Sequence, residues 1–456
     1  MRAPRVMLAA PASGSGKTLI TCGLLQALVN RKMKTSAFKC GPDYIDPMFH
    51  SKIMGIESKN LDTYFASDEI VRYLFGKTAS HTDIAVLEGV MGYYDGIAGI
   101  STNGSAYHVA NVVESPVILV VDTKGMSLSV TALIKGYLEF RPDSRIAGVI
   151  LNRMSAALYS RVKEQIESEL QIKVFGYVPK TEEYVIASRH LGLITPDEVE
   201  HLHETLNGLA DMLETTLDVD GIIALAQSAP DITYEEPKLP KLEEPVTIGV
   251  AKDEAFCFYY RDNLELLEKM GAKIQFFSPL HDREMPKDLD GLILYGGYPE
   301  LHGQALSENV TMRSQMKAEL EAGLPYLAEC GGFMYLHEWL TDPEGQNWPM
   351  LGWIHGSVYK RKTFQRFGYI EVTGQKDQIL GKKGCSCKAH EFHYYESTTN
   401  GDAFLAQKPM VDRNWLCIHG DEQGCAGFPH LYYYSNPEMI YHFLETCKKR
   451  KQRTRV

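Results

Sequence analysis

Short apolar runs alternate with amphipathic stretches along the first part of the chain, and this alternation most constrains the fold. The runs are RVMLAA, TSAFKC, DIAVLEGV, SPVILVVD, IAGVILNR and VFGYVP, with stretches such as TLITCGLLQALVN between them. Continuous valine, isoleucine and leucine runs that alternate with helices are typical of a parallel sheet covered on both faces. The sequence therefore predicts an α/β fold.

The alternation stops once and then starts again. The stretch SAPDITYEEPKLPKLEEP has the prolines and charges of a linker, and the runs VTIGVAKD, AKIQFFSP, DGLILYGGYPE and LPYLAECGGFMYL follow it. Further on, FGYIEVTG and HLYYY look more like antiparallel or edge strands. We predict a first α/β domain over residues 1–230, a linker over 231–245, a second α/β domain over 246–446 and a solvated basic tail over 447–456.

The composition excludes some classes of function. The chain has 456 residues, 44% of them hydrophobic, and a formal net charge of −11, which argues against a nucleic acid or an anionic membrane as the main partner. A local basic pocket could still bind an acidic substrate. The N-terminal residues imitate a signal peptide, but their apolar run is too short for one, and no run approaches the roughly 20 residues of a membrane span. Nine cysteines without a secretory leader indicate reduced thiols, so we expect a cytoplasmic protein.

A phosphate-binding loop follows the first apolar run. The stretch APASGSGKT matches the pattern G-x-x-x-x-G-K-[ST], except that Pro11 replaces the first glycine. The other glycines allow backbone N–H groups to turn toward an anion at a helix N-terminus, the lysine reaches the terminal phosphates of ATP, and the threonine hydroxyl binds Mg²⁺. The residues expected to hold the nucleotide are Gly14, Ser15, Gly16, Lys17 and Thr18.

Acidic side chains and a lysine follow two further strands. Lys39, Asp43 and Asp46 come after one predicted strand, whereas Glu88 ends another and Asp95 lies in the loop beyond it. Open α/β sheets bind ligands at the carboxyl ends of their strands, so we expect these side chains to act on ATP. Lys39 would neutralise a transferring phosphoryl group. The expected Mg²⁺ ligands are Thr18, Asp43 and Glu88.

Two other positions bear on how the loop is used. Asn152 ends a further strand in VILNRM, where it either contacts the adenine or serves as a cap or turn residue, and the sequence leaves both possibilities open. A partitioning or membrane-targeting ATPase switch would carry a lysine at the position of Ala12, so we treat that class as a distant alternative.

A second group of residues surrounds Cys330. In PYLAECGGFMYL an apolar strand is followed by Cys330, by Gly331 and Gly332, and then by a helical pattern. A nucleophile on a sharp strand-to-helix turn needs small neighbours, and a helix N-terminus lowers the pKa of its thiol. Gly296 and Gly297 end a preceding strand and, with Gly331, are suited to donate N–H groups to an oxyanion. We therefore expect Cys330 to be a nucleophile.

A nucleophilic thiol requires a base, and the sequence offers more than one. KAHEFHYYE contains His390 and His393, whereas GFPHLYYYSNP contains His430, and composition does not choose between them. A zinc site at Cys385, Cys387 and His390 is disfavoured because C-x-C lacks the spacing of a structural zinc site and no partner pair is nearby.

The motifs together resemble one family over nearly the whole chain. SGSGKT, KCGPDYIDP, LEGVMGYYDG, SRHLGL, FCFYYRDNLELL, YGGYPE, AECGGFMYL, HEFHYYE and PHLYYYSNP occur in the order found in the cobyrinic acid a,c-diamide synthase family. The resemblance implies an N-terminal dethiobiotin-synthetase-like ATPase (amidoligase) domain and a C-terminal class I glutamine amidotransferase domain. His390 and Glu391 belong to one of these motifs, and we expect them to contact the substrate or another domain.

The resemblance also implies roles for individual residues. The family's thiol nucleophile falls on Cys330 and its general base on His430. Ordinary class I amidotransferases orient the histidine with a glutamate two residues later, whereas Tyr432 stands here, so the third catalytic residue stays open. Ala328 likewise replaces a usual glycine of the nucleophile turn. In the ATP site the family's positions fall on Lys17, Thr18, Asp43, Glu88 and Asp95.

The activity implied by the resemblance is an ATP-dependent amidation in cobalamin biosynthesis. The a and c side-chain carboxylates of cobyrinate would be activated as acyl phosphates and would accept nitrogen from L-glutamine or ammonia, with Mg²⁺ as cofactor. The expected partners are these small molecules, with a homodimer as a further possibility. The same chemistry on hydrogenobyrinate or Ni-sirohydrochlorin is the nearest alternative. CTP synthase shares the two-domain plan but keeps the glutamate that Tyr432 replaces.

Overall fold

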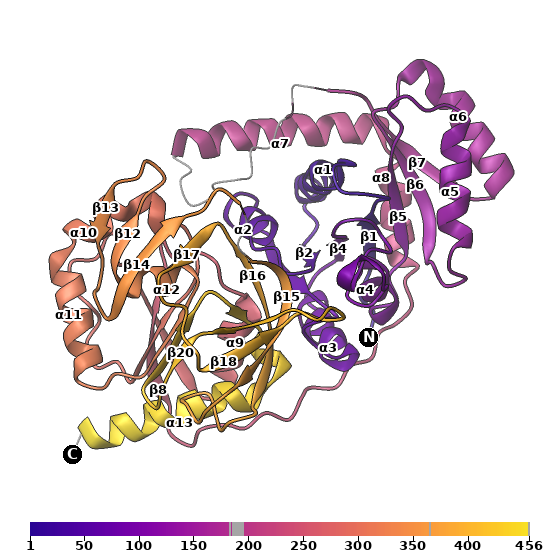
Figure 1. The fold of residues 1–456 in the computed structure, drawn as a ribbon. Coiled ribbons are helices and arrows are strands. Elements are labelled where there is room, and N and C mark those ends of the chain that lie inside the picture. Colours follow the sequence, from indigo (N-terminus) through magenta and orange to yellow (C-terminus); the bar gives the residue numbers. More distant parts are fainter. Residues whose placement is uncertain (182–183, 185–195, 364–365, 455–456) are drawn as a thin grey trace. The chain divides into compact units, whose positions relative to one another are not determined.

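The computed structural model describes residues 1–181, 184, 196–363 and 366–454. The chain forms two compact units, Met1–Pro237 and Lys238–Val456 (Figure 1). The boundary between them falls within the stretch 231–245 that was predicted as a linker. Within the described ranges, we find no helix with the length and apolar character needed to cross a membrane.

The first unit is built on a parallel sheet of seven strands in the order β3-β2-β4-β1-β5-β6-β7. The strands are β1 (Arg5–Ala9), β2 (Thr35–Cys40), β3 (Glu57–Leu61), β4 (Ile84–Glu88), β5 (Val117–Asp122), β6 (Ile146–Asn152) and β7 (Lys173–Val178). The helices are α1 (Lys17–Asn30), α2 (Ile45–Lys52), α3 (Asp68–Ala79), α4 (Ala106–Val112), α5 (Ser129–Glu139), α6 (Ala156–Leu170), α7 (Pro196–Thr216) and α8 (Val219–Gln227), with a short 3-10 turn at Ile97–Gly99. The predicted parallel α/β fold is confirmed.

Successive residues of a central strand show how both faces of this sheet are covered. Ala37 of β2 belongs to a core formed with apolar residues of α1, α7 and α8. The next residue, Phe38, contacts Phe75 of α3, with ring centroids 5.1 Å apart. Because side chains alternate between the faces of a strand, these two contacts lie on opposite faces. This arrangement explains why the strands are continuous apolar runs rather than alternating ones.

The second unit begins with a six-stranded sheet in the order β20-β21-β11-β10-β8-β9, parallel except for the pairing of β20 with β21. Its strands are β8 (Val246–Ala251), β9 (Ala272–Phe277), β10 (Gly291–Leu294), β11 (Tyr326–Glu329), β20 (His419–Gly420) and β21 (Gly424–Gly427). The helices of the unit are α9 (Arg261–Lys269), α10 (Gly303–Glu308), α11 (Val310–Glu321), α12 (Gly331–Leu336) and α13 (Pro437–Thr454), with 3-10 turns at Pro299–His302 and Tyr433–Ser435.

Two smaller sheets complete the second unit. One has the order β13-β12-β14-β17, and the other, β19-β18-β15-β16-β22, is antiparallel. Their strands are β12 (His337–Thr341), β13 (Asn347–Pro349), β14 (Ile354–Lys360), β15 (Arg366–Gly374), β16 (Ser386–His393), β17 (Tyr395–Ser397), β18 (Phe404–Gln407), β19 (Asn414–Cys417) and β22 (His430–Leu431). The antiparallel pairing predicted for FGYIEVTG is found in β15, whereas only the first two residues of HLYYY form a strand.

The basic residues near the C-terminus continue a helix. α13 extends to Thr454, into the stretch expected to be a frayed tail. Arg450 donates a hydrogen bond to the carbonyl of Leu289 and forms an ion pair with Glu319 of α11 at 2.7 Å. These contacts hold the last turns of α13 against the rest of the second unit.

Candidate active sites

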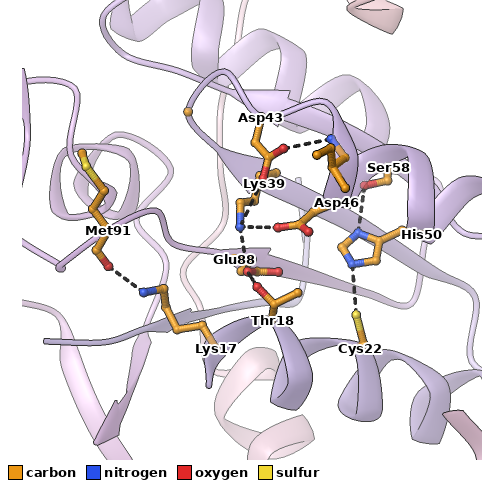
Figure 2. Close-up of polar contacts among 12 residues, drawn as sticks. Lys17, Thr18, Cys22, Lys39, Asp43, Asp46, His50, Ser58, Glu88 and Met91 are labelled. Atoms are coloured by element: carbon orange, nitrogen blue, oxygen red, sulfur yellow. Dashed lines mark hydrogen bonds and ion pairs between the residues drawn. The ribbon is translucent and has the colours of Figure 1, made fainter. Parts of the chain in front are cut away.

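The phosphate-binding loop lies between β1 and α1 and adopts the backbone that its glycines permit. Gly14 and Gly16 have φ values of 77° and 89°, which favour glycine. A Cβ on Gly16 would lie 2.2 Å from the amide nitrogen of Asn152, so the position also excludes a side chain. Lys17 donates hydrogen bonds from Nζ to the carbonyls of Met91 (2.6 Å) and Ala12 (3.2 Å) (Figure 2). Burial, and then the charge of Lys39, lower the pKa of Lys17 to about 8.

A lysine surrounded by carboxylates stands beside this loop. Lys39 Nζ lies 2.7 Å from Glu88 Oε1, 2.5 Å from Asp46 Oδ2 and 4.0 Å from Asp43 Oδ2 (Figure 2). Burial alone would lower the pKa of Lys39, but the charges of Glu88 and Asp46 raise it. Burial and the neighbouring charge of Asp46 raise the pKa of Asp43 to about 7. Lys39 therefore stays charged and holds the ends of β4 and α2 together.

The predicted magnesium ligands fit a divalent cation. Thr18 donates its hydroxyl to Glu88 Oε1 at 2.7 Å, and no described residue donates a hydrogen bond to Glu88 Oε2, which is buried. Thr18, Asp43 and Glu88 all line one cavity of about 590 Å³ above the loop. Mg²⁺ is commonly held by one or two carboxylates together with substrate phosphates, and this donor set suits it.

Asp95 and Asn152, also predicted for the ATP site, form hydrogen bonds to the backbone of nearby loops. Asp95 accepts a hydrogen bond from the Gly92 N–H at 2.9 Å and folds the loop after β4 rather than lining the cavity. Asn152 donates from Nδ2 to the Ser15 carbonyl at 2.9 Å, so it fixes the phosphate-binding loop. This contact of Asn152 to the loop is neither of the two roles, adenine contact or cap or turn residue, that the sequence left open.

α2, the helix that carries Asp46, is held to its neighbours through His50. His50 lies one turn after Asp46 on α2, with Nε2 3.7 Å from Cys22 Sγ and Nδ1 3.2 Å from Ser58 Oγ (Figure 2). Burial lowers the pKa of His50 to about 4, so its imidazole is neutral. These contacts fix the position of α2 through α1 and β3.

Cys330 occupies a sharp turn between β11 and α12. Its φ of 47° is strained for a residue with a side chain, and its N–H donates to the Gly427 carbonyl at 2.8 Å. The Gly332 N–H donates to the Tyr295 carbonyl at 2.9 Å, and a Cβ on Gly332 would lie 2.2 Å from the Leu294 carbonyl oxygen. The double glycine is therefore required for the first turn of α12 to approach β10.

The expected lowering of the pKa of the thiol is wrong for this structure. Burial, and then the charges of Glu300 and Glu391, raise the pKa of Cys330, and the N–H of Gly331 lowers it only in part. α12 spans only Gly331–Leu336, so its N-terminal dipole is small against the cost of burying a thiolate. The thiol is protonated at neutral pH.

The three glycines predicted to form an oxyanion site gather around Cys330. A Cβ on Gly296 would lie 3.4 Å from Cys330 Cβ and 2.5 Å from His430 Cε1. A Cβ on Gly331 would lie 3.0 Å from the backbone nitrogen of Gly297. The strand end after β10 thus lies close to both Cys330 and His430, and a side chain at Gly296 would collide with the imidazole.

Of the histidines left open by the sequence, His430 is the one beside this strand end. β22 pairs with β16, so that His430 faces His390, and their rings stack with centroids 4.9 Å apart. Tyr260 Oη and His390 Nδ1 share a hydrogen bond of 3.1 Å behind the pair. Burial, followed by the charges of His390 and His393, lowers the pKa of His430 well below its usual value. The imidazole of His430 is therefore neutral.

A buried carboxylate that the sequence analysis did not single out lies on the other side of His430. Glu329 Oε2 is 3.9 Å from His430 Nδ1, and burial raises the pKa of Glu329 to about 8. Tyr432, at the position of the usual glutamate, packs its ring against Tyr260 with centroids 5.3 Å apart. The signal for Glu329 was its place at the end of an apolar strand, directly before Cys330.

Cys385 and Cys387, considered as zinc ligands in the sequence, contact polar side chains in the structure. Among the described residues, no group of three or more His, Cys, Asp or Glu side chains is arranged to hold a metal. Cys385 instead accepts a hydrogen bond from Gln378 at 3.3 Å, and Cys387 Sγ lies 3.1 Å from Ser435 Oγ. The motif SRHLGL, residues 188–193, lies outside the described residues.

Comparisons with known proteins match both units. Residues 6–193 match the family model described as the CobQ/CobB/MinD/ParA nucleotide binding domain, and residues 247–427 match the CobB/CobQ-like glutamine amidotransferase domain. The chain is 41% identical over 444 residues to a cobyrinate a,c-diamide synthase of Caldanaerobacter subterraneus subsp. tengcongensis, covering 97% of this chain and 98% of that protein. Proteins of the same name from Priestia megaterium and Clostridium acetobutylicum are 36% and 38% identical, covering 99% and 96% of this chain and 98% and 99% of theirs.

Proposed function

Since the chain belongs to the cobyrinate a,c-diamide synthase family of glutamine-dependent ligases, we propose that it amidates the a and c side-chain carboxylates of cobyrinate in cobalamin biosynthesis. ATP supplies the energy and L-glutamine, or free ammonia, supplies the nitrogen. The observation that carries the proposal is the presence in one chain of an ATP-type loop beside acidic side chains and of a thiol beside a neutral histidine.

The first unit activates the carboxylate. A carboxylate does not accept ammonia directly, because oxide is a poor leaving group. One of its oxygens therefore attacks the γ-phosphorus of ATP, the bond to the β,γ-bridging oxygen breaks, and ADP leaves with an acyl phosphate formed. The loop N–H groups and Lys17 bind the phosphates, while Lys39 positions Asp46 and Glu88. Mg²⁺, held by Thr18, Asp43 and Glu88, would neutralise charge on the phosphates when bound.

The second unit releases ammonia from glutamine. Cys330 Sγ attacks the side-chain amide carbon as His430 accepts the thiol proton, and the N–H groups around Gly296, Gly297 and Gly331 receive the oxyanion. His430 then protonates the leaving nitrogen, so ammonia departs and a thioester remains. Water hydrolyses the thioester to glutamate and restores the thiol. The released ammonia attacks the acyl phosphate, which expels phosphate and leaves the amide.

Glu329 orients His430 in this scheme. The protonated imidazole that forms during attack is buried, and a carboxylate at the opposite ring nitrogen stabilises it. Glu329 Oε2 is 3.9 Å from Nδ1, so a small movement brings the two atoms into hydrogen-bond distance. This carboxylate takes over the task of the glutamate that Tyr432 replaces.

The experiment that tests the substrate is mass spectrometry of the products formed from cobyrinate, hydrogenobyrinate and Ni-sirohydrochlorin. Each macrocycle is incubated with ATP, Mg²⁺ and glutamine. We expect two exchanges of a hydroxyl for an amino group on cobyrinate, and each exchange lowers the mass by about one unit. Double amidation of either other macrocycle alone would overturn the assignment of the substrate. ATP hydrolysis without amidation of any of the three would favour the ATPase switch.

A further inference from the structure

A buried ion pair of unusual geometry lies on β15 and β16. Glu391 is fully buried, and Arg366, which is mostly buried, faces it with Nη1 3.8 Å from Glu391 Oε1. That distance is too long for a hydrogen bond. Neither oxygen of Glu391 receives a hydrogen bond from any described residue, and Arg366 Nη1 donates none to them. Buried charged groups are normally hydrogen-bonded, so this pair requires an explanation.

The other ion-pair contact of Glu391 among the described residues, with His393, also leaves the carboxylate without a hydrogen bond. His393 Nε2 lies 4.0 Å from Glu391 Oε2, and it too has no hydrogen-bond partner in the described part of the chain. His393 Nδ1 donates to the Tyr395 carbonyl at 2.6 Å, which fixes the ring so that Nε2 points toward the carboxylate. The cluster of Glu391, Arg366 and His393 thus holds several polar atoms that no described residue satisfies, and Arg366 reaches the surface with 15% of its side chain exposed.

Ring contacts link this cluster to the helix that follows Cys330. His393 stacks on Phe428, with ring centroids 3.9 Å apart and planes at 6°, and Phe428 packs against Phe333 of α12 at 5.1 Å. α12 begins directly after Cys330. On β16, Glu391 follows His390, which pairs with His430. The charge of Glu391 is also felt by Cys330, whose pKa it raises after burial and Glu300.

The chemistry of the cluster matches one end of the amidotransferase substrate. Glutamine carries an ammonium and a carboxylate on one carbon, three carbon–carbon bonds from the amide carbon that Cys330 attacks. A carboxylate and a guanidinium set side by side, charged and without hydrogen bonds to each other, complement such a head group. The two opposite charges would exchange their long mutual contact for shorter ones to the ligand.

We propose that Glu391 binds the α-ammonium group of glutamine and that Arg366 beside it binds the α-carboxylate. The inference rests on the proposed function, because it assumes that Cys330 attacks glutamine, and it names the groups that select this amide over others. It also assigns a task to Glu391, for which the sequence indicated only contact with a substrate or another domain.

The test compares glutamine with two analogues that each lack one group: 4-carbamoylbutanoate, without the ammonium, and 4-aminobutanamide, without the carboxylate. Ammonia release is measured for wild type, Glu391→Gln and Arg366→Gln. We expect Glu391→Gln to reduce kcat/KM for glutamine roughly thirtyfold, mainly through KM, and to leave 4-carbamoylbutanoate nearly unaffected. Arg366→Gln should show the reverse selectivity, affecting glutamine but not 4-aminobutanamide.

The matched control is Glu371→Gln, which removes an exposed carboxylate from the adjoining strand β15 and should leave the KM for glutamine unchanged. Equal losses for glutamine and 4-carbamoylbutanoate in Glu391→Gln would mean a structural ion pair and would overturn the proposal, as would no loss for either. Ammonia-dependent amidation reports separately on the synthetase reaction. Its absence in wild type would contradict the proposed function and not this assignment.

Discussion

At the residue scale, the environment of His430 explains how the thiol site can work without the usual glutamate. Cys330 has a pKa raised by burial and His430 has a pKa lowered by burial, so both are neutral over the ordinary pH range. The charge separation that accompanies attack must therefore be stabilised by something else. Glu329 is the carboxylate nearest to the imidazole among the ion-pair partners of the described residues, at 3.9 Å.

Glu329→Gln is expected to lower kcat for glutamine hydrolysis about tenfold at pH 8, which corresponds to about 1.4 kcal/mol. Burial raises the pKa of Glu329 to about 8, so in wild type the ionised, stabilising form increases as pH rises through that value. The kcat of wild type should rise over the same interval, and the profile of the variant should be flat. Steady-state ammonia release between pH 6.5 and 9 measures both.

The control for this experiment is Glu321→Gln, which changes an exposed side chain at the end of α11. Its pH profile should coincide with that of wild type. A rise through pH 8 that persists in Glu329→Gln would mean that another group titrates, and Glu329 would then have no part in orienting His430.

How far residues could be predicted depended on whether the signal was local. Lys17, Thr18 and Cys330 belong to short motifs whose glycines indicate a turn. The sequence alone therefore predicted the turns between strand and helix at which the structure places them. Glu329 gave no such signal, because a carboxylate at a strand end reads like any other charged residue until its distance to His430 is known. The pKa of Cys330 was missed because burial is a property of the whole unit.

At the scale of elements, both sites are formed where strands end and a glycine turn begins. β10 ends at Leu294, and Gly296 then lies so close to Cys330 and His430 that a Cβ there would be 3.4 Å from Cys330 Cβ and 2.5 Å from His430 Cε1. On the first unit, β1 leads into the loop with Gly14 and Gly16. In each case the strand fixes the position of a turn, and the proposed reactions use the backbone N–H groups of that turn.

Gly296→Ala is expected to reduce glutamine-dependent amidation at least about a hundredfold, because its methyl group would lie 2.5 Å from His430 Cε1 and displace the base from the thiol. Ammonia-dependent amidation should be retained, since the synthetase reaction does not use this turn. Product formation from each nitrogen source, measured in parallel, checks the prediction.

Gly136→Ala serves as the matched variant for this substitution. Gly136 lies in α5, nothing stands within 4 Å of the position its Cβ would take, and alanine favours a helix more than glycine does. It should leave both activities unchanged. If Gly296→Ala behaves in the same way, His430 does not depend on that turn and its placement as the base is wrong.

The elements that the sequence missed are those without an apolar pattern. β3, with the sequence ESKNL, pairs with β2 at the edge of the first sheet, yet it has no run of valine, isoleucine or leucine that would predict a strand. The parallel strands β1 and β4 were predictable because they are covered on both faces and are apolar throughout. Pairing among β15, β16 and β22, which brings His390 to His430, depends on long-range register.

At the scale of the whole molecule, the two reactions are assigned to separate units. The loop, Lys39 and Glu88 lie in Met1–Pro237, whereas Cys330 and His430 lie in Lys238–Val456. The negative net charge of −11 does not conflict with anionic substrates, because Lys17 lines the ATP-site cavity in the first unit and Arg366, beside Glu391 in the second, is proposed to bind the carboxylate of glutamine. The activities should therefore be separable by substitution.

Cys330→Ala is expected to abolish glutamine-dependent amidation and to leave the ammonia-dependent reaction, because only the release of ammonia from glutamine uses the thiol.

Lys17→Ala is expected to lower amidation at least about a hundredfold with either nitrogen source, because the phosphates of ATP lose their cationic partner. Rates with glutamine and with ammonium chloride distinguish the two variants. Loss of both activities in a folded Cys330→Ala protein would contradict the division of labour.

The central claim is that ATP activates the carboxylate as an acyl phosphate before ammonia attacks. The most direct measurement uses cobyrinate labelled with ¹⁸O in its carboxylates, incubated with ATP, Mg²⁺ and glutamine, followed by mass spectrometry of the inorganic phosphate. Because an acyl phosphate leaves with one carboxylate oxygen, we predict one ¹⁸O atom in the phosphate for each amide formed. Unlabelled phosphate released during amidation would contradict the account.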